Sequence, residues 1–436
     1  MEWEKLLSDK REGVDTPELP NNIRSEFYRD YDRIVFCAPF RRMARKTQVH
    51  PLSFNDHIHN RLTHSIEVGS VGRSLGFAIG DAIKDFLPDG VTPSTISSIV
   101  QAACMAHDIG NPPFGHAGEY AMRQWFTENI QLLNLFLTKR QMSDFFYFEG
   151  NAQGLRVVSR TENHVNNGGL RLTNATLGAL VKYPWGSIHP NTKIKEKFNV
   201  FDSEQIIYDN LCDDLGLIKK DEEGMFSRHP LSYLMEVADD ICYKIIDIED
   251  ALELGVLRFN DVEDIFKLMS GDNKIVDYGN SSTIRQRIIP YRSASIDNLI
   301  QCSVKVFMDN YEDILNGVFE GDLMEKIDGD AKIGLRKAKE ITQENIFSTR
   351  RKIELEVGSY ATIEVLLDSF IEAINHKIEF KEKIPFKSKR ILDLIGHPIS
   401  DDISYYDGYL MVTDFISGMT DNYATFIAKQ ISGNAK

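Results

Sequence analysis

The stretch that decides the fold is His-Asp-Ile-Gly-Asn-Pro-Pro-Phe-Gly-His-Ala-Gly-Glu, residues 107–119. It follows Thr95–Ala106, an apolar segment that predicts a buried helix, which Gly110 and the two prolines after it would end. A second helix is expected to begin near Ala117. The His-Asp pair therefore stands at the end of a buried helix, where a charged side chain needs a partner.

Helical patterns dominate the rest of the chain. The segment Leu231–Leu254 carries apolar residues every three or four positions, the spacing of a helix that faces a core. A charged helix with a solvated face is expected over about 332–350, and a surface excursion over 185–199. The best strand candidates are short, at Arg33–Phe36 and Lys377–Phe380. These patterns predict an all-α, mostly helical fold with a helical C-terminal region and few short strands.

Composition narrows the class of protein. The chain has 436 residues, of which 42% are hydrophobic and 26% charged, so a large folded core is expected rather than disorder. Its net charge of −15 argues against a broad DNA-binding surface, which needs a basic stripe. Five cysteines without a Cys-x-x-Cys pair fit reduced thiols in a cytoplasmic protein. A charged N-terminus and the lack of long apolar runs predict neither a signal peptide nor a membrane span.

Four side chains suggest a metal site: His64, His107, Asp108 and Asp239. Imidazole and carboxylate together suit a divalent transition metal or a Mg²⁺-like ion. Two His and two Asp ligands would leave positions open for water and substrate, and an open metal generates a nucleophile by lowering the pKa of bound water. A lone histidine on a helix is more often a satisfied core residue, so the prediction depends on the four residues together.

A wider pattern of motifs includes these four residues. It consists of Arg61, His64, His107, Asp108, His116, Glu119, Asp239, Tyr243 and Asp247, with FRRMARKTQV (40–49), NRLTHSIEV (60–68), VKYPWG (181–186), ADDICYKIIDIEDAL (238–252) and STRRKIELEVGSY (348–360). The pattern resembles the HD-domain dNTP triphosphohydrolases, and most closely their bacterial dGTPase branch. The resemblance runs across most of the chain, is very specific up to about residue 256 and is looser beyond.

The resemblance implies a reaction and a division of the chain. The reaction would be metal-dependent hydrolysis of dGTP or a related dNTP at the α-phosphorus, releasing a deoxynucleoside and tripolyphosphate. The metal held by the four residues above would be Mn²⁺ or Mg²⁺, with Co²⁺ or Fe²⁺ as further candidates. An N-terminal segment, 1–59, would contribute to the substrate pocket. Residues 60–256 would form the catalytic HD domain, and residues 257–436 a helical region for base recognition and oligomer contacts.

By the same resemblance, His116 and Glu119 would be the catalytic pair. His116 is expected at the positive end of a helix, which disfavours imidazolium, and a carboxylate three residues later would offset this. Such a histidine suits proton transfer to the departing 5′-oxygen or handling of the attacking water. The alternative for Glu119 is a capping-box glutamate that only stabilises the helix start.

Further matched residues would contact the substrate. Arg61 and Lys182 correspond to phosphate ligands of the family, and a guanidinium fork suits phosphate oxygens. Tyr243 and Asp247 follow Asp239 at four and eight positions, so all three share one stripe of a helix that could line the metal, the sugar and the phosphates.

Other parts of the chain would contact the base and the sugar. Gln48 and Val49 match family positions near the sugar and base. Phe347 and Glu356 resemble residues around guanine, and Arg390 would complete that pocket from a neighbouring subunit. A charged helix explains Glu356 and Arg390 equally well.

The chain departs from the family pattern at one position. Some family members carry a histidine four residues after the HD histidine, where this chain has Asn111, and this puts a supporting hydrogen bond in doubt.

The resemblance also bears on assembly, and alternative functions remain. The family tends to form homo-oligomers, commonly hexamers in the dGTPase branch. The alternatives are an HD phosphohydrolase acting on nucleoside monophosphates or signalling nucleotides, and a protein that senses nucleotides or binds single-stranded nucleic acid. The acidic composition disfavours nucleic acid as the main ligand.

Overall fold

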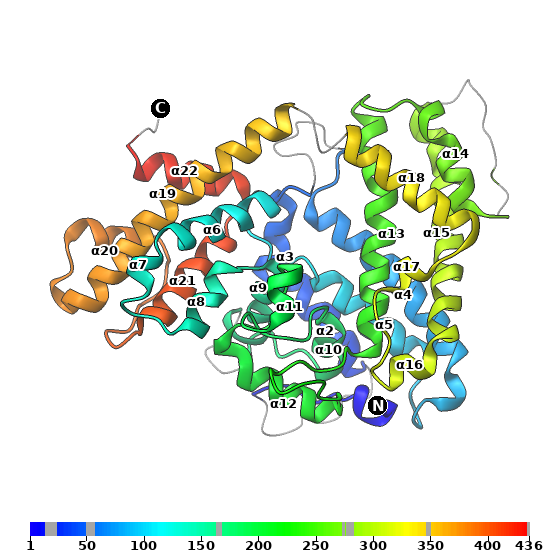
Figure 1. Ribbon diagram of the computed structural model, residues 1–436, viewed down its shortest axis with the longest axis horizontal. Coiled ribbons are helices and arrows are strands. Elements are labelled where there is room, and N and C mark those ends of the chain that lie inside the picture. The colour runs from blue at the N-terminus through cyan, green and yellow to red at the C-terminus, as the bar shows by residue number, and fades with distance from the viewer. Residues whose placement is uncertain are drawn as a thin grey trace.

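The computed structural model describes residues 1–13, 24–48, 57–162, 168–272, 275, 283–345 and 350–433, and these residues fold into helices joined mostly by short loops (Figure 1). The longer helices are α2 (Glu26–Phe36), α4 (Arg61–Ala82), α5 (Pro93–Ala106), α6 (His116–Glu128), α8 (Lys139–Phe146), α9 (Gly150–Arg156), α10 (Asn174–Leu180), α12 (Gln205–Leu215), α13 (Pro230–Glu253), α14 (Phe259–Ser270), α15 (Ile284–Asp309), α18 (Gly329–Asn345), α19 (Arg350–Phe380), α20 (Phe386–Asp393), α21 (Tyr405–Ser417) and α22 (Asp421–Ile431).

Short helical segments connect them. These are α1 (Trp3–Leu6), α3 (Ala38–Arg42), η1 (Met43–Arg45), η2 (Lys84–Phe86), α7 (Ile130–Leu133), the π-helical η3 (Val157–Thr161), α11 (Pro190–Lys195), η4 (Asp202–Glu204), α16 (Tyr311–Leu315), α17 (Leu323–Lys326) and η5 (Lys381–Lys383). Within the described residues, β-pairing is limited to isolated bridges such as the one between Thr47 and Asn60. No helix in this part of the chain is long and apolar enough to cross a membrane.

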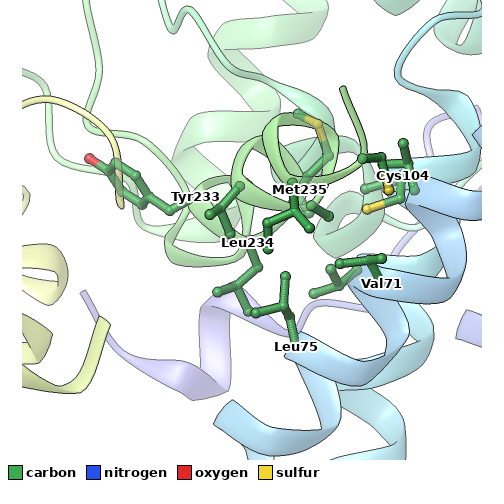
Figure 2. Packing of buried hydrophobic residues seen from close by; sticks show 14 of the residues in the cluster. Val71, Leu75, Cys104, Tyr233, Leu234 and Met235 are labelled. Carbon is green, nitrogen blue, oxygen red and sulfur yellow. The ribbon is translucent and has the colours of Figure 1, made fainter. Parts of the chain in front are cut away.

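Two hydrophobic cores organise the helices. The larger core is formed mainly by α2, α4, α5, α10 and α12–α15, with part of α18, and the smaller by α6, α8 and α19–α22. In the larger core, Leu234 and Met235 of α13 face Val71 and Leu75 of α4, with Cys104 of α5 close by (Figure 2). Figure 1 shows α13, α4 and α15 at one end of the molecule and α19–α22 at the other. Helix α6, which starts at His116, packs in the smaller core with α19–α22.

The helices α4 and α5 pack closely against each other. A Cβ atom added at Gly76 of α4 would lie 2.8 Å from Ser97 Cα of α5, so only glycine allows this approach. His64 lies on α4 and His107 directly follows α5. The close packing therefore determines the separation of two predicted metal ligands.

The all-α prediction is confirmed, and so are the helices over 95–106 and 231–254 and the helix start near 117. The predicted helix over 332–350 is found as α18, which ends at Asn345. Both strand predictions are wrong, because Arg33–Phe36 ends α2 and Lys377–Phe380 ends α19. In α2 the fully buried Ile34 lies one helical turn after the buried Asp30, and this packing outweighs the β preference of Ile and Val.

Candidate active site

Three helices bring His64, His107 and Asp239 together. One potential ligand atom from each lies within 4.8 Å of the other two, and no second group of this kind is found among the described residues. His64 Nε2 lies 3.0 Å from Asp239 Oδ1, and His107 Nε2 lies 3.6 Å from the same oxygen. The residues come from α4, the end of α5 and the middle of α13, so the helix packing of the larger core assembles the group.

The chemistry of this group fits a divalent cation. His107 Nδ1 donates a hydrogen bond to the backbone oxygen of Cys104 at 2.6 Å, which leaves Nε2 as the atom available to a metal. That Nε2 is buried and has no hydrogen-bond partner in the described part of the chain. Burial alone would lower the pKa of His107, but the carboxylates of Asp108 and Asp239 raise it to about 9. A divalent cation bound to Nε2 would take the place of the proton on that atom, with the two carboxylates to balance its charge.

Asp108 lies beside this group rather than within it. Its Oδ2 accepts a hydrogen bond from Arg61 Nη1 at 2.7 Å and is 3.7 Å from His107 Nε2. Its Oδ1 accepts from the side-chain amide of Asn111. Asn111 therefore supplies the supporting hydrogen bond that its place in the motif had left in doubt. The role of Asp108 as a fourth ligand stays a prediction.

The second predicted pair, His116 and Glu119, makes direct contact. His116 begins α6 with its side chain 75% exposed, and its Nδ1 lies 2.8 Å from Glu119 Oε2. Glu119 is buried, and its Oε1 accepts from the backbone N–H of Gly150 at 2.8 Å. The Glu119 carboxylate thus bonds to the imidazole and to a neighbouring segment, which is more than a helix cap requires.

Lys197 keeps the Glu119 carboxylate ionised. Burial would raise the pKa of Glu119, but Lys197 and His116 outweigh burial and hold that pKa well below its usual range. Lys197 Nζ is 3.8 Å from Glu119 Oε2 and also pairs with the buried Glu149. An ionised Glu119 holds the His116 ring in place through the contact with Nδ1.

Sequence reasoning missed Lys197 because residues 185–199 were expected to be a surface excursion. That expectation is partly wrong. Trp185 and Phe198 are buried, and Trp185 Nε1 donates to the backbone oxygen of Lys197 at 2.8 Å. Two large aromatic side chains in a polar segment were the available signal, because such residues bury 150–250 Å² each and anchor the chain around them.

Arg61 joins the two groups of predicted residues. It is the first residue of α4, and its guanidinium contacts Asp108 on one side. On the other side, a Cβ atom added at Gly115 would lie 2.8 Å from Arg61 Nη2. Since Gly115 directly precedes His116, the Arg61 side chain runs from the residues beside the His64–His107–Asp239 group to the turn before His116.

The other predicted substrate residues differ in their charge and hydrogen-bond partners. Lys182 Nζ pairs with Glu236 Oε1 at 3.2 Å, and the carboxylates around it raise its pKa, so it stays cationic despite its burial. Burial and the carboxylate of Asp247 raise the pKa of Tyr243. Gln48 Oε1 is buried without a hydrogen-bond partner among the residues that the structure describes.

Two residues of the predicted base pocket, Glu356 and Arg390, belong to the described part of the chain. Val49 and Phe347 lie outside the described residues, and Glu356 is a half-buried residue of α19. Arg390 is exposed on α20, where it pairs with Asp393 at 3.0 Å. In Figure 1, α20 lies at one end of the molecule, and α13 lies well away from it in the other half. Arg390 therefore lies far from the metal group of its own chain.

The paired histidine–aspartate motif at the end of a buried helix, completed by aspartate from a later helix, defines an HD-domain protein. Consistent with this class, a family model described as HD domain matches residues 61–177.

Comparison with curated proteins gives the particular family. The chain is 44% identical to a deoxyguanosinetriphosphate triphosphohydrolase-like protein of Pseudomonas aeruginosa, covering 100% of this chain and 99% of the relative. It is 36% identical to a protein of the same description from Synechocystis, covering 99% of each. It is 29% identical to the deoxyguanosinetriphosphate triphosphohydrolase of Salmonella arizonae, covering 93% of this chain and 94% of that enzyme. The chain belongs to the deoxyguanosinetriphosphate triphosphohydrolase-like family of HD-domain phosphohydrolases.

Proposed function

We propose that the protein hydrolyses dGTP or a closely related dNTP to a deoxynucleoside and tripolyphosphate. One observation carries the proposal: Arg61 spans from the buried His64–His107–Asp239 group to the turn that presents His116. A phosphate-binding side chain between a cation site and a proton-transfer residue suits hydrolysis of a phosphate ester.

The proposed metal ligands are His64, His107, Asp108 and Asp239, with Mn²⁺ or Mg²⁺ as the expected ion and Co²⁺ or Fe²⁺ as further candidates. A divalent cation bound there would act as a Lewis acid and lower the pKa of a bound water. Nitrogen and carboxylate donors together favour Mn²⁺, Fe²⁺ or Co²⁺ over Ca²⁺.

The protein's own residues supply binding and proton transfer. Arg61 and Lys182 bind the anionic tail, and Tyr243, Asp247, Gln48 and Val49 line the sugar and base. The 5′-oxygen is a poor leaving group and needs a proton, which His116, whose side chain is exposed, would give. Glu119 holds that ring through Nδ1, so that Nε2 is the atom left for the substrate.

The three parts of the chain have distinct roles in this proposal. Residues 1–59 contribute to the substrate pocket, 60–256 supply metal binding and catalysis, and 257–436 supply base recognition and oligomer contacts. Because Arg390 lies far from the metal group of its own chain, it could complete a base pocket only in a neighbouring subunit. We therefore propose a homo-oligomer, a hexamer by family resemblance, acting in the cytoplasm.

The test is product analysis by HPLC with each of the four dNTPs and with Mg²⁺, Mn²⁺ or Co²⁺. The proposal expects deoxyguanosine and intact tripolyphosphate from dGTP, with ¹⁸O from labelled water in the tripolyphosphate. Recovery of dGMP with pyrophosphate, or of dGDP with phosphate, would refute attack at the α-phosphorus. Release of phosphate from monophosphates alone, or binding without turnover, would favour the alternative HD phosphohydrolase or the sensor.

Two variants separate metal binding from chemistry. Asp239→Ala should fold, lose bound Mn²⁺ and lose turnover. His116→Ala should keep Mn²⁺ and dGTP affinity while kcat falls by about two to four orders of magnitude. His397→Ala changes an exposed histidine outside the site and is the control. Full activity of Asp239→Ala, or of the chelated enzyme, would remove the basis for the metal assignment.

A further inference from the structure

The first residue of helix α22 contacts Phe114–Gly115, the turn before the proposed catalytic residue His116, which we call the catalytic turn. Asp421 is 2% exposed, and its Oδ1 accepts a hydrogen bond from the backbone N–H of Phe114 at 2.9 Å. Its Oδ2 accepts from the backbone N–H of Thr47 at 3.0 Å and also from the Thr47 hydroxyl. One buried carboxylate thus bonds to the residue two before His116 and to the residue before Gln48.

The turn that Asp421 holds has an unfavourable backbone conformation. Phe114 has φ +65° and Gly115 has φ +59°, and α6 begins at the next residue, His116. A non-glycine residue with positive φ costs free energy and persists only where surrounding contacts impose it. The Phe114 side chain packs against the smaller core, which contains α22. The direction in which His116 points therefore depends on contacts made by the C-terminal helices.

A second buried side chain holds the other end of the same segment. Lys46 is 3% exposed, and its Nζ donates to the backbone oxygens of Asn111 and Ser417, each at 2.6 Å. Ser417 is the last residue of α21, just before α22. The segment between the HD pair and His116 is thus joined to the C-terminal helices at both ends, by Lys46 and by Asp421.

We infer that Asp421 is a positioning residue for catalysis: its carboxylate holds the Phe114–Gly115 turn that aims His116, and through Thr47 it also places Gln48. The inference rests on the proposed function for the roles of His116 and Gln48. It gives the C-terminal region a part in setting the catalytic turn, in addition to the base recognition and oligomer contacts proposed above.

The first test is Asp421→Ala, which removes both acceptors. The kcat for dGTP should fall about tenfold to hundredfold, since a small misplacement of a catalytic group has effects of that size. Mn²⁺ affinity should stay within about twofold, because the proposed ligands lie on α4, at the end of α5 and on α13. A protein that is only less stable would not lose kcat while it keeps its Mn²⁺ affinity.

Two variants control for general loosening and for the second contact. Thr420→Ala removes the N-cap of α22, whose side chain accepts from Tyr423 N–H, but leaves the Asp421 carboxylate in place. It should leave kcat and KM within about twofold of the wild type. Thr47→Val removes only the hydroxyl bond to Asp421, so KM for dGTP should rise a few-fold while kcat stays near the wild-type value.

Amide hydrogen exchange tests the contact whether or not the chain hydrolyses dNTPs. Asp421→Ala should speed exchange at Phe114 and Thr47 at least about tenfold, and Thr420→Ala should not. If Asp421→Ala does not fold, Asp421→Asn serves, because an amide cannot accept at both atoms and one of the two N–H groups loses its acceptor. Unchanged exchange at both amides would overturn the inference, as would an unchanged kcat in an active enzyme. Absence of dNTP hydrolysis by the wild type would refute the proposed function instead.

Discussion

Replacing Gly76 by alanine tests whether the contact between α4 and α5 controls both stability and the metal site. The new Cβ would lie 2.8 Å from Ser97 Cα, 3.1 Å from the Ser97 nitrogen and 3.1 Å from the Ile96 oxygen. All three are backbone atoms, so no change of rotamer can relieve the overlap. Ordinary contact begins at 3.4 Å, so the helices must separate by about 0.6 Å at this point (3.4 less 2.8).

The expected loss of stability follows from two opposed effects. Alanine in place of glycine favours a helix by about 1 kcal/mol. Overpacking of a well-packed contact costs typically about 1–3 kcal/mol, and occasionally more. Because backbone atoms are involved on the α5 side, we expect the high end of this range and a net destabilisation of about 2 kcal/mol.

Urea unfolding of Gly76→Ala and of a matched control measures this effect. Gly358 lies in α19, and a Cβ added there meets nothing within 4 Å, so Gly358→Ala should stabilise by about 0.5–1 kcal/mol. The two alanine variants should therefore shift the unfolding midpoint in opposite directions. Gly76→Ala should also bind Mn²⁺ more weakly, since ligands must be held to within about 0.5 Å.

The result that would refute this reasoning is a Gly76→Ala protein as stable as Gly358→Ala. It would show that α4 and α5 adjust without cost. Normal stability with weakened Mn²⁺ binding would contradict the packing argument but keep the geometric link between the helices and the site.

Three further predictions concern side chains away from this contact. Burial raises the pKa of Asp144 to about 7, so the stability that this group contributes is present below about pH 4 and is lost as pH rises to 7. Burial lowers the pKa of His229 to about 4, so the stability that this group contributes is present above about pH 6.5 and is lost as pH falls to 4. These effects, about 4 kcal/mol for Asp144 and about 3 kcal/mol for His229, oppose one another. Relative to the wild type, Asp144→Asn should lose stability on acidification and His229→Gln on alkalinisation, measured by urea unfolding between pH 4 and 7. Lys197→Met should raise the pKa of Glu119, and kcat should then fall with an acidic limb of the pH–rate profile moved upward; an unmoved limb would contradict the assigned charge. Asn111→Ala removes a hydrogen bond to the HD aspartate and should weaken Mn²⁺ binding by about tenfold in a metal titration, and unchanged affinity would count against that supporting role.

Much of the candidate site could be predicted because its residues lie in local patterns. The His-Asp pair ends an apolar helix, and His116 and Glu119 are three residues apart at the start of the next, so their contact follows from helix geometry. The same geometry places Asp239 on the core-facing helix α13. The strand predictions failed because they used residue preference over four residues, whereas Ile34 belongs to an eleven-residue helix with a buried face.

The sequence by itself determined the helical class, the family and the candidate chemical groups, because helix periodicity and short motifs act over a few neighbouring residues. Only the tertiary structure decided which distant groups meet those residues. Lys197 reaches Glu119 because two buried aromatic residues anchor its segment, and Asp421 reaches Phe114 because α22 packs in the smaller core. The physical reason is that a buried charge takes the partner that helix packing brings to it, and that partner lies anywhere in the chain.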